Sequence, residues 1–378
     1  MSSTRRAGQI VQRGDRTFLV RVYLGRDSDT GKRQYHNKTI HGTKKDAQAY
    51  LNRVLRDRDM GAYVEPSKTP LDDFLDQWLE SAVKPRVRER TLQSYREVLR
   101  LYVRPELGRQ PMASITPLGI QTLYGALLER GLSPRTVRYA HSVLRNALEQ
   151  AVKWQMLHQN PAQHVDLPRQ KREEMRSLSP DEARQFLEAC VVNRYGILFE
   201  LLLTTGLRPG EALGLKWSDI DWDSGRLRVQ RVLLPTGGFE EPKTARARRT
   251  LPLPSSTVQS LRDHRRNQAE ERLEAGAQWQ DNDLIFAAEG GKPVNHINLV
   301  RRHFKPLLKD AGLSERFRLY DLRHTCATLL LSAGENPKIV SERLGHASIT
   351  LTLDTYSHVL PDMQEGAAAK LEEMLYLK

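Results

Sequence analysis

The chain has 378 residues, of which 39% are hydrophobic and 28% charged, so it is long enough for two or three domains with their own cores. Its formal net charge of +13 favours a polyanion or an anionic membrane surface as partner. The N-terminal stretch lacks an apolar core and no run of about 18 apolar residues occurs, which argues against a signal peptide and a membrane span. Two cysteines, Cys190 and Cys326, are too few for a disulfide framework or a thiolate metal site. We therefore expect a cytoplasmic protein that acts on nucleic acid.

The most basic part of the chain is its beginning. Residues 1–63 contain 14 Lys/Arg against 6 Asp, a net charge of +8. Residues 16–42 alternate apolar and basic side chains around a turn and predict strands, and Thr43 is a suitable N-cap for a helix with Ala47, Leu51 and Leu55 inward. A small sheet with one helix and a basic face can lay its strands in a DNA groove. The alternative is a small domain with a solvated basic surface.

A linker at 65–70 leads to a stretch that predicts helices only. Thr91 and Ser133 are candidate N-caps, and Pro134 suits a first helical turn. Many arginines lie on the predicted outer faces, which suits gripping DNA, although such a bundle would also serve as a plain scaffold. The predicted helices span 70–82, 88–103, 116–130 and 133–156.

After a boundary at 167–177 the pattern becomes mixed. Strands are expected at 226–233 and 248–254, on either side of a turn at 235–238. The other elements are helices at 180–191, 195–205, from Pro209 onward, 256–275, 295–312, 321–333, 337–344, 348–357 and 363–376. The predicted fold class is multidomain and mainly α with α+β, comprising a small N-terminal sheet-plus-helix domain, an all-helical domain and a mixed, mainly helical α/β domain.

Two arginines stand at predicted helix beginnings in this last part. Arg208 precedes Pro209, and Arg323 lies in the first turn of an apolar helix. Unpaired N–H groups and the helix dipole favour an anion there, and two planar guanidinium groups would offer paired donors to phosphate oxygens. The alternative is that each arginine pairs with a buried carboxylate, such as Glu211 or Asp321.

A third segment, 344–359, carries a histidine and a tyrosine. Gly345 is expected to end one helix and Ser348 to cap the next, which places His346 on a tight turn and Tyr356 near the end of the second helix. A tyrosine hydroxyl, with a pKa near 10, is a weak nucleophile unless its surroundings are strongly positive. Two arginines, a histidine and a bound phosphate would supply such surroundings.

These motifs together resemble those of the tyrosine recombinases of the phage and transposon integrase type. The resemblance rests on Arg208 in TTGLRPGEALGLKW, Lys243 in EPKTARARRTLPLP, and the segments YDLRHTCATLLLSAG and LGHASITLTLDTYSHV. It implies an arm-site DNA-binding domain at 1–63, a helical core-site DNA-binding domain at 64–170, and a catalytic domain with a C-terminal tail helix at 171–378.

The resemblance also implies a role for each matched residue. Tyr356 would attack a DNA phosphate, leaving a 3′-phosphotyrosyl bond and a free 5′-hydroxyl. Arg208 and Arg323 would stabilise the transition state and His346 would bond the phosphate. Lys243 would protonate the leaving oxygen. No cofactor is implied, neither metal nor ATP, because the phosphodiester energy is kept in the protein–DNA bond.

Basic residues beside Lys243 are expected to contact DNA, and one family position departs from the pattern. Arg246, Arg248 and Arg249 would touch backbone phosphates. Tyr320 stands where the family usually has histidine, and a phenol can bond a phosphate but cannot act as an imidazole base near neutral pH. We expect Tyr320 to contact the phosphate still, and His324, next to Arg323, to point elsewhere.

The partners implied are double-stranded DNA at core and arm attachment sites and a homo-tetramer on that DNA, with a host DNA-bending protein and a directionality factor as further candidates. The tail helix would dock on its own domain or on a neighbouring subunit. Three alternatives stay open: a type IB topoisomerase, a DNA-binding regulator whose catalytic site has decayed, and a metallonuclease using His346 and His358.

Overall fold

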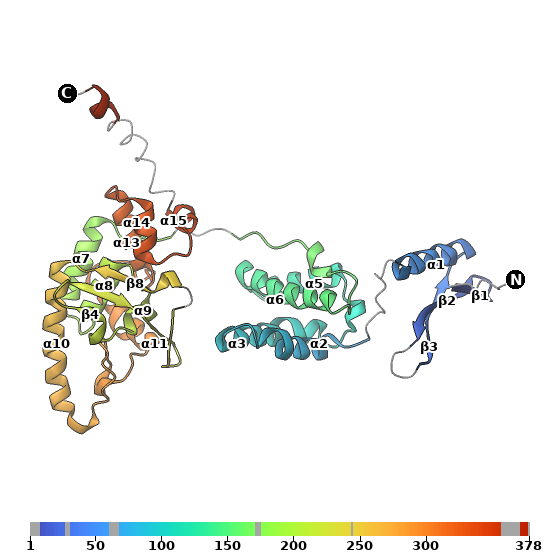
Figure 1. The fold of residues 1–378 in the computed structure, drawn as a ribbon, viewed down its shortest axis with the longest axis horizontal. Coiled ribbons are helices and arrows are strands. Elements are labelled where there is room, and N and C mark those ends of the chain that lie inside the picture. Colours follow the sequence, from blue (N-terminus) through green and yellow to red (C-terminus); the bar gives the residue numbers. More distant parts are fainter. Residues whose placement is uncertain are drawn as a thin grey trace. The chain divides into compact units, whose positions relative to one another are not determined.

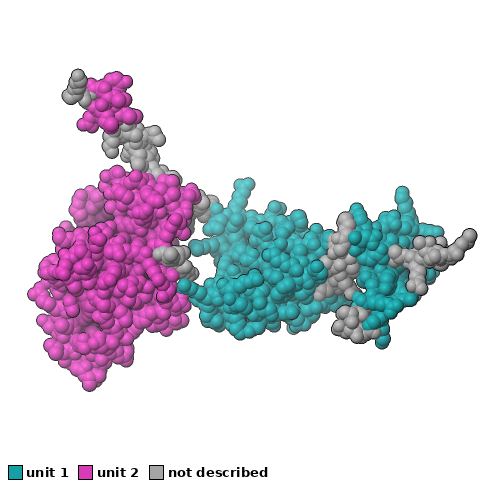
Figure 2. Space-filling view, in the orientation of Figure 1, with its two compact units in different colours: residues 1–172 teal, residues 173–378 magenta. Residues whose placement is uncertain are grey.

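The computed structural model describes residues 8–26, 31–59, 68–170, 175–242, 245–356 and 371–376. The chain divides into two compact units, residues 1–172 and 173–378 (Figure 2). The predicted fold class is confirmed, since the elements are mainly helices with a small antiparallel sheet near the N-terminus (Figure 1). Among the described residues, no helix has the length and apolar character that a membrane span requires.

The first unit begins with a three-stranded antiparallel sheet and one helix. Alternate residues of the middle strand, Phe18, Val20 and Val22, lie on one face and pack with three helical residues. Thr43 begins the helix as predicted, because its hydroxyl accepts from the Asp46 backbone N–H while the Asp46 carboxylate accepts from the Thr43 N–H. The elements are β1 (Gly8–Gly14), β2 (Thr17–Arg26), β3 (Arg33–His41) and α1 (Lys44–Asp59).

The rest of the first unit is helical and has a hydrophobic core of its own. Ser133 caps its helix through the Thr136 N–H, as predicted, whereas Thr91 lies inside a helix whose N-cap is Arg88. In the core the hydroxyl of Tyr124 lies 3.0 Å from Nδ1 of His141. The helices are α2 (Leu71–Trp78) and α3 (Glu89–Val98), each extended by a π-helical turn (Leu79–Val83, Leu99–Val103), then α4 (Arg104–Leu107), α5 (Pro117–Glu129) and α6 (Pro134–Lys153).

In the second unit the sheet differs from the predicted one. The expected strand at 226–233 is two strands, because its first half pairs with β8 (Arg249–Pro252) and its second half pairs with β7 (Phe239–Glu240). The strands are β4 (Ile220–Asp221), β5 (Arg226–Val229), β6 (Val232–Leu233), β7 (Phe239–Glu240) and β8 (Arg249–Pro252), with sheet order β4-β5-β8. Residue Lys243 lies outside the described residues.

Helices surround this sheet, and the predicted site residues that the structure describes lie at or next to the ends of α9 (Pro209–Leu213), α13 (Asp321–Ser332), α14 (Pro337–Leu344) and α15 (Ile349–Tyr356). Helix α8 (Gly196–Thr205) is buried along most of its length, α13 packs against it, and α14 connects α13 to α15 (Figure 1). The helices are α7 (Pro180–Cys190), α8 (Gly196–Thr205), α9 (Pro209–Leu213), α10 (Ser255–Ala275), α11 (His296–Leu299), α12 (Lys305–Asp310), α13 (Asp321–Ser332), α14 (Pro337–Leu344) and α15 (Ile349–Tyr356); a π-helical turn, Val300–Phe304, joins α11 to α12. Residues 371–376 are also helical.

Candidate active site

Arg323 is the most unusual residue of the second unit, because it is a cation with only 1% of its surface exposed. Its Nη1 donates to the carbonyl oxygen of Gly206 at 2.6 Å, and its Nη2 has no hydrogen-bond partner among the described residues. Pairing with Asp321, one of the two predictions for it, is wrong: that carboxylate binds Arg318 at 2.7 Å. A buried guanidinium with an unsatisfied donor is costly, and an acceptor placed against Nη2 would remove that cost.

The carbonyl that meets Arg323 is placed by a glycine. Gly206 ends α8 in the left-handed region, with φ of +66°. A Cβ at this position would lie 2.6 Å from Cδ2 of Leu344 on α14. Glycine therefore allows α8, α13 and α14 to approach at one point.

Arg208 has the carboxylate partner that Arg323 lacks. Its Nη1 donates to Oε1 of Glu211 at 2.7 Å, and Nη2 of Arg249 donates to Oε2 at 3.0 Å. Burial favours the neutral acid, but Arg249 and Arg208 outweigh it and hold the pKa of Glu211 below its usual range. Since 36% of the Arg208 side chain stays exposed, Glu211 orients this arginine without covering it.

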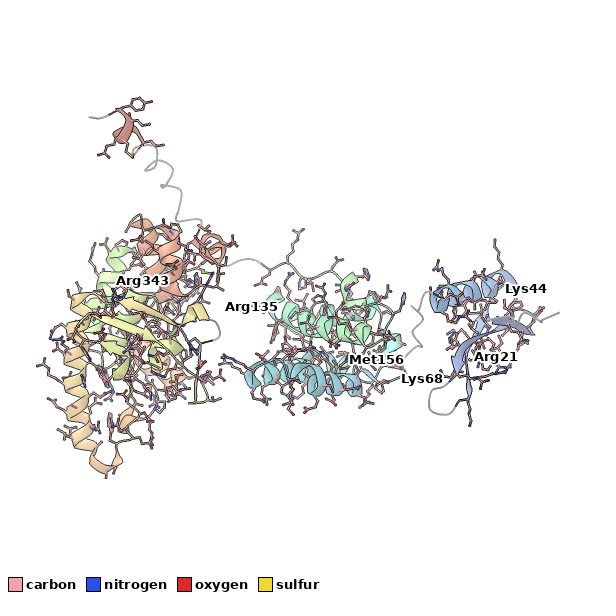
Figure 3. All side chains as sticks on the ribbon, viewed as in Figure 1. Arg21, Lys44, Lys68, Arg135, Met156 and Arg343 are labelled. Atoms are coloured by element: carbon pink, nitrogen blue, oxygen red, sulfur yellow. The ribbon has the colours of Figure 1, made fainter. Side chains whose placement is uncertain are left out.

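The three arginines that follow Lys243 do not all reach outward as expected. Arg249 is buried, and besides Glu211 its Nε donates to the carbonyl of Arg343 at 2.7 Å (Arg343 is labelled in Figure 3). The expectation that Arg249 touches DNA is wrong, because its guanidinium joins β8 to α9 and α14 within the unit. Arg248 pairs with Glu241 at the surface, and Arg246 donates to the carbonyl of Ala347.

Tyr356 is buried to 1% exposure at the end of α15, in a small apolar cluster with residues of α13 and α14. Its hydroxyl lies 2.8 Å from Nδ1 of His324. The expectation that His324 points elsewhere is therefore wrong. Residues 321–327 are all buried, so α13 presents side chains to its neighbours in several directions and not along a single face.

His346 lies where the turn was predicted. Gly345 ends α14 with φ of +68°, and Nδ1 of His346 lies 2.7 Å from the hydroxyl of Thr352 on α15. Burial, followed by the charges of Arg323 and Arg208, lowers the pKa of His346 to about 4. The imidazole is therefore neutral at physiological pH.

The positive surroundings expected to activate the tyrosine are only partly realised. Burial raises the pKa of Tyr356, and Arg323 opposes this effect without cancelling it. Burial and the like charge of Arg208 lower the pKa of Arg323 to about 10, so it stays protonated at neutral pH.

Tyr320, which is 40% exposed, lies against His324 with ring centroids 5.3 Å apart. Burial lowers the pKa of Arg208, but Glu211 and then the Tyr320 hydroxyl raise it overall.

Five of the six predicted site residues are thus gathered at one place: Arg208, Tyr320, Arg323, His346 and Tyr356. Lys243 and His358 lie outside the described residues. In the described part of the chain, no group of three or more His, Cys, Asp or Glu side chains is arranged to hold a metal ion. The alternative that Arg208 pairs with Glu211 is correct. Sequence reasoning missed His324 as a part of the site, and its position directly after Arg323 was the available signal.

Comparisons with known proteins identify the class to which this arrangement belongs. Residues 176–363 match the model of the Phage integrase family, and residues 71–128 match the Phage integrase N-terminal SAM-like domain. The chain is 33% identical to a XerC-like tyrosine recombinase of Caldanaerobacter subterraneus, covering 96% of this chain and 98% of that protein. It is 27% identical to the ICEBs1 integrase of Bacillus subtilis, over 95% and 97% of the two chains.

Solved structures show the same fold. A Tn1549 transposon integrase in complex with a circular intermediate DNA superposes with a TM-score of 0.69 and 22% identity, covering 80% of this chain and 99% of that one. A lambda integrase bound to a core site superposes with a TM-score of 0.59 and 20% identity, covering 94% and 95%. The chain belongs to the phage integrase family of tyrosine recombinases. It is a site-specific DNA recombinase of the integrase type found in mobile elements.

Removing the charge of Glu211 tests how the arginines are held. We expect Glu211→Gln to reduce the free energy of unfolding by roughly 3 kcal/mol at pH 7, because Arg249 stays buried without its anion. Cleavage of DNA should fall at least about tenfold, since Arg208 loses its orientation. Urea unfolding and a single-turnover cleavage assay measure the two effects.

The loss of stability should depend on pH. A carboxyl whose pKa is lowered on folding stabilises the protein above its unfolded pKa, near 4.5, and this contribution disappears as the pH falls through the folded value. The difference between parent and Glu211→Gln should therefore shrink below pH 4.5. As a control, Asp219→Asn breaks another buried pair, with Arg231, and should lose stability but keep cleavage. If Glu211→Gln cleaves DNA at the same rate as Asp219→Asn, the positioning role of Glu211 is contradicted.

Proposed function

We propose that Tyr356 is the nucleophile of this recombinase. Its oxygen attacks a DNA backbone phosphate, which forms a 3′-phosphotyrosyl bond and releases a 5′-hydroxyl. Arg208 and Arg323 stabilise the negative charge on the non-bridging oxygens, and His346 donates a hydrogen bond to one of them. Lys243 protonates the leaving 5′-oxygen. A 5′-hydroxyl from a partner DNA then reverses the step on a new strand.

One observation carries this proposal: Nη2 of Arg323 is buried without a hydrogen-bond partner among the described residues, in the same cluster as Arg208, His346 and Tyr356. An acceptor with more than one oxygen satisfies it, and a phosphate diester delivers such oxygens with a matching negative charge. The phenol and its target would then lie at one site. Tyr320, whose hydroxyl is close to Arg208, is proposed to contact the same phosphate.

The parts of the chain are proposed to divide DNA recognition between them. Residues 1–63 bind arm sites, residues 64–170 bind the core site, and residues 171–378 cut and rejoin it, in the cytoplasm. The active assembly is a tetramer on DNA, helped by a host DNA-bending protein and a directionality factor. The helix at 371–376 leaves Leu371, Met374 and Leu375 more than half exposed, which supports docking on another subunit. A monomeric complex on DNA, measured by mass, would favour a topoisomerase instead.

Covalent trapping tests the proposed chemistry. The protein is incubated with DNA from the ends of its element in EDTA, quenched with detergent and digested with protease. We expect a nucleotide-bearing peptide that contains Tyr356. A nucleotide on another residue would move the nucleophile, and a link that forms only when EDTA is omitted would overturn the metal-independent mechanism.

Removal of residues 1–63 tests the division of DNA recognition. The sheet and helix of this region have a hydrophobic core separate from that of the helical bundle, so we expect the truncated chain to fold. Its affinity for a core-site duplex should change less than threefold, while binding to arm-site DNA should fall at least about a hundredfold, because the most basic surface is lost. Electrophoretic mobility assays on the two duplexes measure this, and normal recombination by the truncated chain would contradict the arm-binding role.

A further inference from the structure

His324 occupies a position in the site that the proposed reaction does not yet use. It is 8% exposed, its Nδ1 lies 2.8 Å from the Tyr356 hydroxyl, and its ring also contacts that of Tyr320. It belongs to the first turn of α13, directly after Arg323. It therefore touches the atom that attacks in the proposed mechanism.

The direction of this hydrogen bond follows from the neighbours. The phenol is buried, and a buried O–H needs an acceptor. Arg323 and Arg208 offer only donors, whereas a neutral imidazole can accept at Nδ1 when its proton is on Nε2. The Tyr356 hydroxyl therefore donates to His324.

The remaining described groups near Tyr356 are poor proton acceptors. Tyr320 is a phenol at the position where the family usually has histidine, and the buried thiol of Cys326 has a raised pKa. Nδ1 of His346 is already bonded to Thr352. His324 is the imidazole in contact with the hydroxyl.

We propose that His324 is the general base of DNA cleavage in this chain, in place of the imidazole that Tyr320 replaces. As the Tyr356 oxygen bonds to phosphorus, its O–H bond breaks and the proton moves to Nδ1 of His324. The bond from phosphorus to the 5′-oxygen breaks, and that oxygen takes a proton from Lys243. In the rejoining step the imidazolium returns its proton to the departing tyrosine oxygen.

The charges around His324 suit this cycle. Burial, with Arg323 and Arg318 beside it, lowers the pKa of His324 to about 4, so the ring is neutral and able to accept before DNA binds. Asp321 acts in the opposite direction, and a bound phosphate adds a second negative charge that favours the imidazolium. His346 also faces this group and is neutral.

The chain contains an internal control for a buried tyrosine–histidine pair. In the helical bundle, Tyr124 is 1% exposed and its hydroxyl lies 3.0 Å from Nδ1 of His141, which is 7% exposed. The two pairs match in burial and geometry, but neither residue of the bundle pair has Arg323 or the other site residues beside it. The bundle pair isolates the structural effect of losing such a histidine.

The test compares His324→Asn with His141→Asn. Asparagine places an amide oxygen near the position of Nδ1, which keeps an acceptor for the tyrosine but removes the base. Cleavage is measured in single turnover on ordinary DNA and on DNA with sulfur in place of the leaving 5′-oxygen, since a thiolate leaves without protonation. We expect His324→Asn to cleave both substrates at least about a hundredfold more slowly than the parent, and His141→Asn to cleave both at the parent rate.

Other variants separate this inference from the proposed function on which it rests. Lys243→Ala should cleave ordinary DNA slowly and the sulfur-containing DNA at a restored rate, because a thiolate leaving group does not need the proton that Lys243 supplies. A detergent-stable link in Tyr356→Phe would overturn the nucleophile itself. If His324→Asn cleaves the sulfur-containing DNA within threefold of the parent, His324 is not the base.

Two checks guard against a folding defect. DNA affinity within twofold of the parent and a melting temperature close to that of His141→Asn establish that His324→Asn is folded. If it is not, His324→Gln takes its place, with the same loss expected. In the folded variant, 10 mM imidazole should measurably accelerate cleavage of the sulfur-containing DNA at pH 7, by up to about tenfold. The same acceleration in His141→Asn would contradict the assignment.

Discussion

Tyr356→Phe is expected to abolish the covalent protein–DNA bond while leaving DNA binding within twofold of the parent. Phenylalanine keeps the ring that packs with α13 and α14 but has no oxygen to attack phosphorus. The protein should lose about 1 kcal/mol of stability, because His324 is left without its hydroxyl partner. Detergent-quenched gels with labelled DNA measure the covalent bond, and fluorescence anisotropy measures binding.

Tyr124→Phe is the matched control for this change. It also removes a buried hydroxyl from a histidine, at a position in the helical bundle. Its stability should fall by a similar amount, but its covalent yield should equal that of the parent. A residual link in Tyr356→Phe above the background of a no-protein reaction would mean that another residue attacks. An equal loss of covalent yield in both variants would mean that the defect is one of folding.

The roles of the site residues were predicted from the resemblance to the tyrosine recombinases, whereas the places of two of them in the fold were predicted from local helix-capping signals. Gly345 and Ser348 mark a helix end and a helix start, and these marks placed His346 on its turn and Tyr356 on the last turn of α15. Such signals act within a few residues of the chain, so they can be recognised without knowledge of the tertiary structure. The positions of the helices were accessible for the same reason.

The choice of partners was not accessible in this way. Arg208 and Arg323 both stand at helix beginnings, yet one pairs with Glu211 and the other donates to the carbonyl of Gly206. The difference arises because α8 ends at a left-handed glycine beside α13, which is a contact across more than a hundred residues of sequence. The orientation of His324 and the burial of Arg249 depend on long-range packing of the same kind, which periodicity in one segment does not encode.

Replacing Arg323 by methionine should stabilise the free protein and at the same time disable it. Arg323 is 1% exposed, and in the described part of the chain its guanidinium has no carboxylate partner and its Nη2 has no hydrogen-bond acceptor. Methionine has a similar length and no charge to desolvate, so we expect the free energy of unfolding to rise by about 1–2 kcal/mol. Cleavage should fall by about 10²–10³-fold or more, because a donor aimed at the phosphate is lost. Urea unfolding without DNA and single-turnover cleavage measure these opposite effects.

A second arginine in the same unit provides the contrast. Arg231 pairs with the buried carboxylate of Asp219, so Arg231→Met strands an anion and should destabilise the protein while sparing cleavage. Inorganic phosphate should raise the melting temperature of the parent but not that of Arg323→Met, because a ligand stabilises only a state that binds it. If Arg323→Met is less stable than the parent, the arginine stabilises the folded protein, and its burial is not explained by anion binding. The unsatisfied Nη2 would then not be a cost that the fold bears for anion binding, and the proposed phosphate site would lose its main support.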